Sequence, residues 1–152
     1  MARYIGRDLH KKFAVFSSIN EHGKLDAPVR VANDRLELAA YLKTLPSGAP
    51  VAVEAGGSSY WFVDQLEHAG LDVRLVHPLE AKKRMGGRQK TDAPDVAGLA
   101  ILLRTGSLPQ VWIPPAGLRD LRGLLRTCLA LRRHTTTFKN RIHGGLAALW
   151  TV

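Results

Sequence analysis

Four acidic residues stand where apolar segments end or where helices are expected to begin: Asp8, Glu54, Asp92 and Asp95. Acids are the minority in this chain, which has 13 Asp and Glu against 22 Lys and Arg. Carboxylates that converge repel one another unless a cation lies between them, and Mg²⁺ prefers such hard oxygen ligands. We therefore predict a site for Mg²⁺ or Mn²⁺ and, because the chain is basic, chemistry on nucleic acid.

Each acid also has an ordinary structural explanation. Asp8 suits the cap of a turn. Asp92 suits the N-cap of a helix whose first turn contains Pro94 and Asp95, and the spacing of three places Asp92 and Asp95 on one helix face. Glu54 is harder to explain in this way, because it ends a short apolar run at the edge of the sheet where α/β folds bind ligands.

Strand-like and helix-like patterns alternate between these acids. Predicted strands cover residues 4–8, 12–19, 28–32, 50–54 and 71–76. Predicted helices cover residues 34–45, 60–68 and 92–104, with one further turn at 79–84. A strand meander followed by right-handed crossovers predicts an α/β fold, a mixed sheet with flanking helices. This is the element order of the ribonuclease H-like fold, although order alone also suits other α/β folds.

Apolar spacing in the first predicted helix indicates which of its side chains are buried. We expect this set to be Leu36, Leu38, Ala39, Ala40 and Leu42.

A basic stretch precedes the third helix and is expected to hold the phosphate backbone beside the acids. Its cationic residues are Lys82, Lys83, Arg84, Arg88 and Lys90. Gly86 and Gly87 favour a loop there. The alternative is a solvated basic loop without a ligand.

The last part of the chain has a different character. Residues 111–152 contain seven Lys and Arg and one acid, or +6 of the total charge of +9. Leucines recur at helical spacing over 116–149, so we predict a long basic amphipathic helix, weakened near 134–137, that packs on a partner. The predicted organisation is thus a domain at 1–110 and a helical extension, the start of a coiled coil, at 111–152.

Composition excludes several classes of protein. No apolar run approaches the roughly 18 residues needed to cross a membrane, and the start lacks a signal-peptide pattern. The single Cys128 cannot form an intramolecular disulfide, and the six His residues lack zinc-ligand spacing. We expect a cytoplasmic, nucleoid-associated protein without a membrane partner.

Three blocks of sequence together resemble a known family. The first is residues 4–11, Tyr-Ile-Gly-Arg-Asp-Leu-His-Lys; the second is 53–57, Val-Glu-Ala-Gly-Gly, followed by 66–73. The third is His77-Pro78 with 90–95, Lys-Thr-Asp-Ala-Pro-Asp. In this order they resemble the DEDD transposases of the Piv/MooV-type insertion-sequence family, which are bridge-RNA-guided recombinases with a RuvC-like N-terminal domain.

The resemblance implies roles for particular residues. Asp8, Glu54, Asp92 and Asp95 would be the metal-binding and catalytic tetrad of a RuvC-like, ribonuclease H-like domain that acts on DNA in transposition. His10 and Lys11 match the motif and would contact phosphate, although a solvated hairpin turn explains them equally well. The implied partners are DNA, a guide (bridge) RNA and further copies of the chain, joined through the C-terminal helix.

Two other readings stay open beside this one. Family members continue into a second domain with a serine nucleophile, whereas this sequence ends at Val152. It is therefore expected to be a truncated member, and a catalytically silent DNA- or RNA-binding fragment is the alternative. A nucleotide-binding phosphotransferase of the actin and sugar-kinase type is disfavoured, because no glycine-rich phosphate turn follows Asp8.

Overall fold

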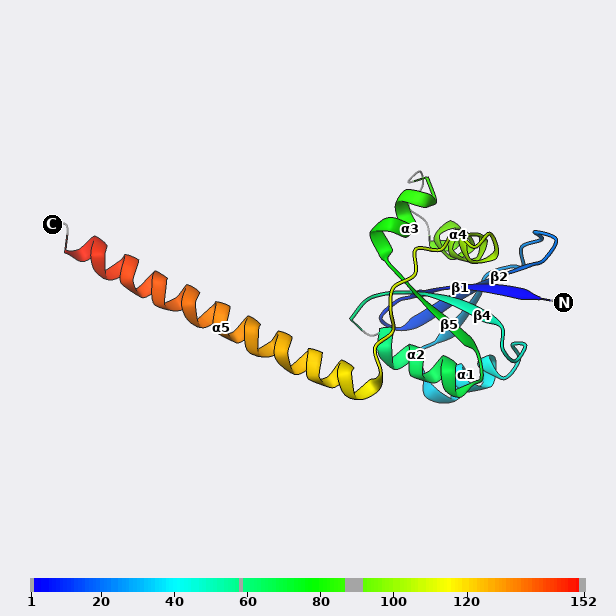
Figure 1. Ribbon diagram of the computed structural model, residues 1–152, viewed down its shortest axis with the longest axis horizontal. Coiled ribbons are helices and arrows are strands. Elements are labelled where there is room, and N and C mark those ends of the chain that lie inside the picture. The colour runs from blue at the N-terminus through cyan, green and yellow to red at the C-terminus, as the bar shows by residue number, and fades with distance from the viewer. Residues whose placement is uncertain (1, 58, 87–91, 151–152) are drawn as a thin grey trace. The chain divides into compact units, whose positions relative to one another are not determined.

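The computed structural model describes residues 2–57, 59–86 and 92–150, and of residues 92–94 it describes only the backbone. The chain divides into two compact units, Met1–Trp112 and Ile113–Val152. The first unit holds the sheet and its helices, and the second is a single long helix (Figure 1). Each unit is described by itself.

One five-stranded sheet organises the first unit. In spatial order its strands are β3 (Val29–Ala32), β2 (Phe13–Asn20), β1 (Arg3–Leu9), β4 (Pro50–Glu54) and β5 (Asp72–Val76). β1 pairs antiparallel with β2, and β2 with β3, whereas β1–β4 and β4–β5 are parallel. The α/β fold predicted from the element order is confirmed: a meander of three strands joined to crossover units gives a mixed sheet.

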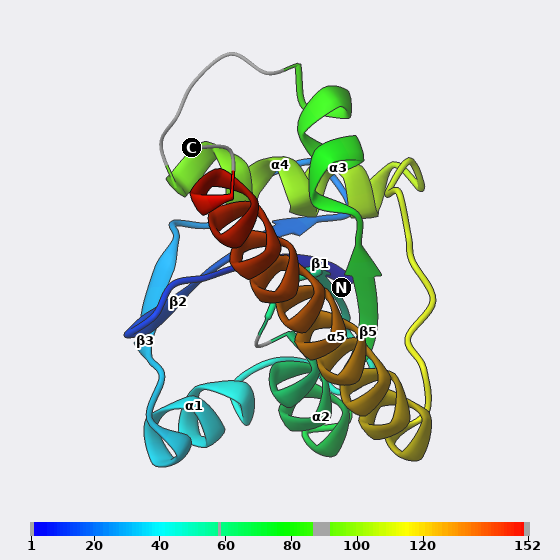
Figure 2. The same cartoon turned by 90° about the vertical axis from the view of Figure 1, so that its left-hand side faces the viewer.

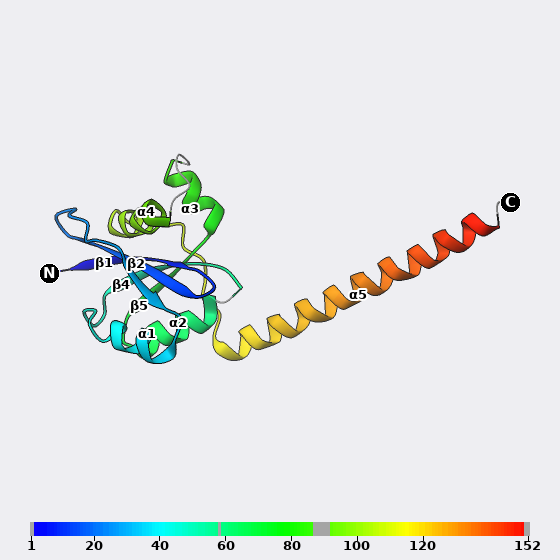
Figure 3. The same cartoon turned by 180° about the vertical axis from the view of Figure 1, so that it is seen from behind.

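Helices cover both faces of this sheet (Figure 2). On one side lie α1 (Arg35–Leu42) and α2 (Ser59–His68), and on the other α3 (Pro78–Arg84) and α4 (Asp92–Arg104). Figure 3 shows the same layers from behind. The turn predicted at 79–84 is helix α3, which begins where the His77 side chain accepts a hydrogen bond from the Glu80 backbone N–H.

α4 lies directly on the central strand, and a glycine makes this possible. A Cβ on Gly6 of β1 would collide with the Val96 carbonyl oxygen and lie 2.9 Å from the Ala100 backbone nitrogen. On the neighbouring strand, Ala52 belongs to a buried cluster with Leu99. Small residues on two adjacent strands therefore let the backbone of α4 approach the sheet closely.

α1 differs from the prediction in length and in the side chains it buries. It ends at Leu42, and only Leu38 and Leu42 are buried. Leu36 is 81% exposed, and Ala39 and Ala40 are exposed as well, so the expectation that all five were core residues was wrong. A two-turn helix that contacts an edge strand presents only one narrow stripe to the sheet.

The second unit is α5 (Ala116–Leu149), an unbroken helix of 34 residues in which no described residue is buried. The weakening expected near 134–137 is absent. Thr135, Thr136 and Thr137 each donate a hydroxyl hydrogen bond to the carbonyl four residues earlier, which satisfies them inside the helix. None of the helices in the described part of the chain is both long and apolar enough to span a membrane.

Candidate functional site

Strand register brings Asp8 and Glu54 together. β1 and β4 run parallel with Gly6 opposite Ala52 and Arg7 opposite Val53, and the same register continued by one residue sets Asp8 beside Glu54. Side chains alternate along a strand, so Asp8 shares the α4 face with Gly6, and Glu54 shares it with Ala52. Two carboxylates separated by 45 residues of sequence thus become neighbours at the carboxyl end of the sheet.

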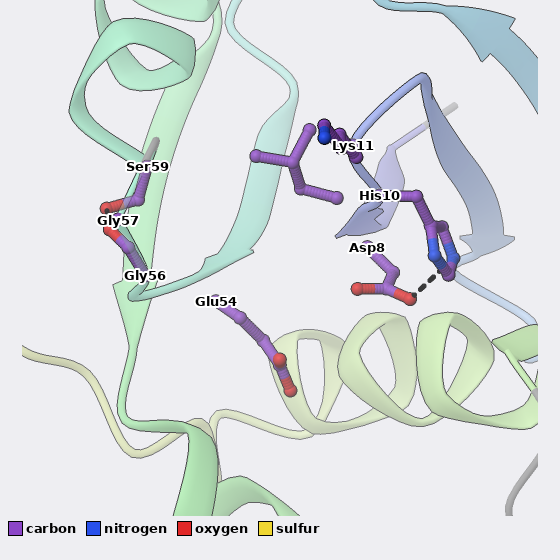
Figure 4. Close-up of a pocket in the computed structure, with 8 residues that line it drawn as sticks. Asp8, His10, Lys11, Glu54, Gly56, Gly57 and Ser59 are labelled. Atoms are coloured by element: carbon purple, nitrogen blue, oxygen red, sulfur yellow. Dashed lines mark hydrogen bonds and ion pairs between the residues drawn. The ribbon is translucent and has the colours of Figure 1, made fainter.

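A hollow of about 320 Å³ opens at this end of the sheet. Its walls come from the end of β1, the following turn, Glu54, and the segment that begins α2. The lining residues are Asp8, Leu9, His10, Lys11, Glu54, Gly56, Gly57 and Ser59. Figure 4 shows the Asp8 and Glu54 carboxylates directed to the same side of the hollow, toward the ribbon of α4.

The electrostatics of Glu54 show that its acidic neighbours act on it. Burial raises the pKa of Glu54, and the negative charges of Asp8 and Asp95 raise it further, whereas Lys82 opposes the shift. A carboxyl whose ionised form is disfavoured by two other carboxylates is stabilised by a nearby cation. The structure therefore brings Asp95 within electrostatic reach of Glu54.

The start of α4 is positioned by its packing on β1. Arg104, at the opposite end of the helix, donates to the Glu21 carbonyl oxygen at 3.4 Å, so α4 runs antiparallel to β1 and begins near the carboxylates. Asp92 is the first helical residue, but its side chain lies outside the described part of the structure.

Asp8 also has a basic neighbour. His10 Nε2 lies 3.2 Å from Asp8 Oδ2, and the His10 ring stacks on Phe13 with centroids 4.4 Å apart. The Asn33 side-chain amide donates to the His10 carbonyl oxygen at 2.7 Å, which anchors the turn between β1 and β2. The turn therefore holds His10 against Asp8.

The basic residues predicted to hold phosphate do not all face the site. Lys82 acts electrostatically on Glu54, and Lys11 lines the hollow. Lys83, in contrast, pairs with Glu80 at 2.8 Å, and Arg84 Nη1 donates to the Ser107 carbonyl oxygen at 2.5 Å. Arg88 and Lys90 lie outside the described residues.

Among the described residues, no three side chains of His, Cys, Asp or Glu are grouped closely enough to hold a metal ion. The Asp92 side chain is not in that set. The donors that the structure does bring together are nevertheless carboxylates in a half-buried setting, which is the donor chemistry that Mg²⁺ and Mn²⁺ prefer.

Three residues near the site were not singled out in the sequence. Gly6 supports α4, Arg7 is 1% exposed with its guanidinium 3.4 Å above the Phe62 ring, and Arg30 lies over Phe13. Gly6 and Arg7 belong to the first sequence block and Arg30 to none, but all three acquire their roles from a neighbour on another element.

Comparison with known proteins decides the family. The model of a family of DEDD transposases of the IS110 type, described as "Transposase", matches residues 5–151. The chain belongs to this family. A curated relative from Sinorhizobium fredii (strain NBRC 101917 / NGR234), named "Putative transposase y4qE", is 34% identical over 73 residues, which cover 48% of this chain. The match spans only 19% of that relative's length.

Solved structures identify the fold of this transposase domain. A structure titled "T. thermophilus RuvC in complex with Holliday junction substrate" superposes with a TM-score of 0.51 at 12% identity, covering 73% of this chain and all of that one. A second Thermus thermophilus RuvC structure gives the same score at 14% identity and covers 72% of this chain and 99% of its own. The predicted RuvC-like, ribonuclease H-like fold is confirmed.

Proposed function

We propose that this chain is the N-terminal catalytic domain of a DNA transposase and that it performs metal-dependent phosphoryl transfer on DNA during transposition of an insertion sequence. The observation that carries the proposal is the juxtaposition of Asp8 and Glu54 at the ends of adjacent parallel strands, with the charge of Asp95 acting on Glu54. A turn cap or a helix start explains one acid at a time, whereas the convergence of three acids at one edge of a basic domain favours a bound cation.

The residues at this edge suit a divalent cation. Asp8, Glu54, Asp92 and Asp95 would supply carboxylate oxygens. Burial raises the pKa of Glu54 most, and the repulsion by Asp8 and Asp95 that adds to this shift is one that a bound cation would relieve. When bound, Mg²⁺ or Mn²⁺ stabilises the charge that develops on phosphate oxygens during phosphoryl transfer. The acids of this chain would hold the ion, and the hollow beside them would receive the strand.

Basic groups around the hollow would bind the DNA backbone. Lys11 lines the hollow, Lys82 acts electrostatically on Glu54, and His10 lies beside Asp8. The other members of the proposed phosphate-binding set are Lys83 and Arg84 at the end of α3, with Arg88 and Lys90. The net charge of +9 favours a polyanionic partner.

We also propose that the two parts of the chain have different roles. Residues 1–110 would form the nuclease domain and 111–152 the beginning of a coiled coil that joins copies of the chain. α5 supports this idea because its leucines are exposed: Leu118, Leu121, Leu124, Leu125, Leu129, Leu131, Leu146 and Leu149. Sedimentation of the chain at increasing concentration tests this assembly. A guide RNA and nucleoid association are further parts of the proposal and rest on the family resemblance alone.

The metal site is tested by calorimetry with Mn²⁺ on the wild-type chain and on Asp8→Asn. We expect binding by the wild type and a loss of at least about tenfold in affinity in Asp8→Asn, because one charged ligand is removed. Asp72→Asn is the matched control, since Asp72 pairs with Arg74 on β5 and should leave binding unchanged. Equal Mn²⁺ affinity in wild type and Asp8→Asn would refute the assignment of the acids.

A second candidate function is a catalytically silent DNA-binding fragment. The observation that favours it is that the described acids are not grouped closely enough to hold a metal. This alternative predicts salt-sensitive DNA binding that is indifferent to Mn²⁺ and to Asp8→Asn. Cleavage of a branched DNA that requires both Mn²⁺ and Asp8 would exclude it.

A further inference from the structure

Arg30 lies in the same cross-strand row as the carboxylates. Asp8 of β1 is opposite Val15 of β2, and Val15 is opposite Arg30 of β3. Residues that are opposite one another in a sheet share a face, so Arg30 stands on the face that carries Asp8 and Glu54. Two strand spacings of about 4.8 Å place the Arg30 backbone roughly 10 Å from that of Asp8.

An aromatic ring fixes the guanidinium of Arg30. Its Cζ lies 3.5 Å from the centroid of the Phe13 ring, while the His10 ring stacks on Phe13 at 4.4 Å between centroids. Two planar groups at these heights cannot share one side of a ring, so Phe13 is held between His10 and Arg30. The His10–Phe13–Arg30 stack thus runs from the Asp8 carboxylate to an exposed cation.

The side-chain hydrogen-bond donors of Arg30 are not used within the described part of the protein. Apart from its contact with Phe13, no side-chain hydrogen bond or ion pair joins the Arg30 guanidinium to another described residue. A guanidinium that stacks through its face keeps its N–H edge available, and that edge matches two oxygens of a phosphate. Stacking also reduces the conformational freedom that binding would otherwise remove.

We propose that Arg30 binds a backbone phosphate of the DNA strand that occupies the carboxylate site, and that Phe13 positions its guanidinium for this contact. The inference rests on the proposed function, because it takes DNA as the occupant. A distance of roughly 10 Å corresponds to two or three nucleotides at an axial rise of about 3.4 Å per nucleotide in one strand. Arg30 would therefore set the register of the strand and not take part in the chemistry.

The test measures binding of a short fluorescein-labelled single-stranded DNA to the full chain by fluorescence anisotropy, with EDTA present so that metal binding plays no part. We expect Arg30→Ala to weaken binding about five- to tenfold at low salt. The slope of log affinity against log salt should fall by roughly 0.7, the value for one lost contact to a single-stranded phosphate.

Arg35→Ala is the matched control. Arg35 is an exposed arginine on α1, which lies on the opposite side of the sheet. Its substitution removes one positive charge, as Arg30→Ala does, but at a position away from the row that contains Asp8 and Arg30. Its binding should change less than about twofold. Phe13→Leu retains the charge of Arg30 and removes the ring that orients it, so its affinity should lie between those of wild type and Arg30→Ala.

The possible failures are distinguishable. Equal losses in Arg30→Ala and Arg35→Ala would overturn this inference and leave the metal site untouched, since that site is tested separately by calorimetry. Absence of DNA binding by the wild-type chain would overturn both the inference and the DNA partner of the proposed function. Circular dichroism of each variant verifies that the substituted chains are folded.

Discussion

The two faces of the sheet treat consecutive residues of β1 in opposite ways. Arg7 faces α2, is 1% exposed and stacks on Phe62, whereas the side chain of Asp8 faces α4 and stays 24% exposed beside the hollow. On the first face a charge is covered by the core. On the second, α4 packs closely against Gly6, while Asp8, two residues farther along the strand, lines the hollow.

The two faces of the sheet differ in the cost of placing a charged side chain on them. Burial lowers the pKa of Arg7 to about 9, the neighbouring charge of Asp8 opposes this shift, and two guanidinium nitrogens, Nε and Nη2, are buried without a hydrogen-bond partner among the described residues. Such a group costs stability. The acids on the other face retain solvent contact, and a cation would offset their mutual repulsion.

Of the substitutions on the two faces, one that disturbs the close packing of α4 should change the free energy of unfolding most. Gly6→Val places a branched side chain against the Val96 backbone, which cannot move without lifting the helix from the sheet. We expect a loss of about 3 kcal/mol or more in the free energy of unfolding, measured by urea denaturation.

Gly57→Val is the control for that substitution, because a Cβ at Gly57 meets no atom within 4 Å. If both glycine variants unfolded at the same urea concentration, the close approach of α4 would not be what stabilises this face.

Removing the buried charge of Arg7 should change the free energy of unfolding less, and should increase it. Arg7→Met keeps an unbranched side chain beside Phe62 and eliminates the unpartnered nitrogens. We expect a gain of about 1 kcal/mol, or a rise in Tm of about 4 °C by differential scanning calorimetry. Arg7→Ala, in contrast, leaves a cavity and should be destabilising. A lower Tm in Arg7→Met would show that Arg7 stabilises the core.

The smallest change in stability is expected at the hollow itself. Gly57→Val should alter the free energy of unfolding by less than about 0.5 kcal/mol. Its side chain would nevertheless occupy space in the hollow, so DNA affinity measured by anisotropy should fall by about tenfold, or 1.4 kcal/mol. Unchanged DNA affinity in this variant would show that the hollow is not part of the DNA-binding surface.

Local patterns were sufficient to predict much of the fold. The aromatic and β-branched residues at 12–19, the apolar run at 51–53 and the acid and proline at the start of α4 each identify their element without reference to the rest of the chain. The prediction was wrong for Leu36, Ala39 and Ala40. Their burial depends on how much of α1 the edge strand β3 can cover.

The types of residue in the candidate site could be predicted from the sequence. The contacts that bring them together could not. Asp8 and Glu54 are recognisable as acids at strand ends, and His10 and Lys11 as parts of a motif. The contributions of Gly6, Phe13 and Arg30 were not predictable, because each depends on a residue of another element: Val96, His10 or Val15.

The sequence by itself determined that this chain has alternating strands and helices, a basic charge, a long amphipathic helix and acids at the ends of its elements. These properties follow from local spacing and composition. Only the tertiary structure decided that Asp8 and Arg7 belong to different environments and that Glu54, Asp8, Val15 and Arg30 form one row. The reason is physical: strand register and helix approach are set by the pairing and packing of distant segments.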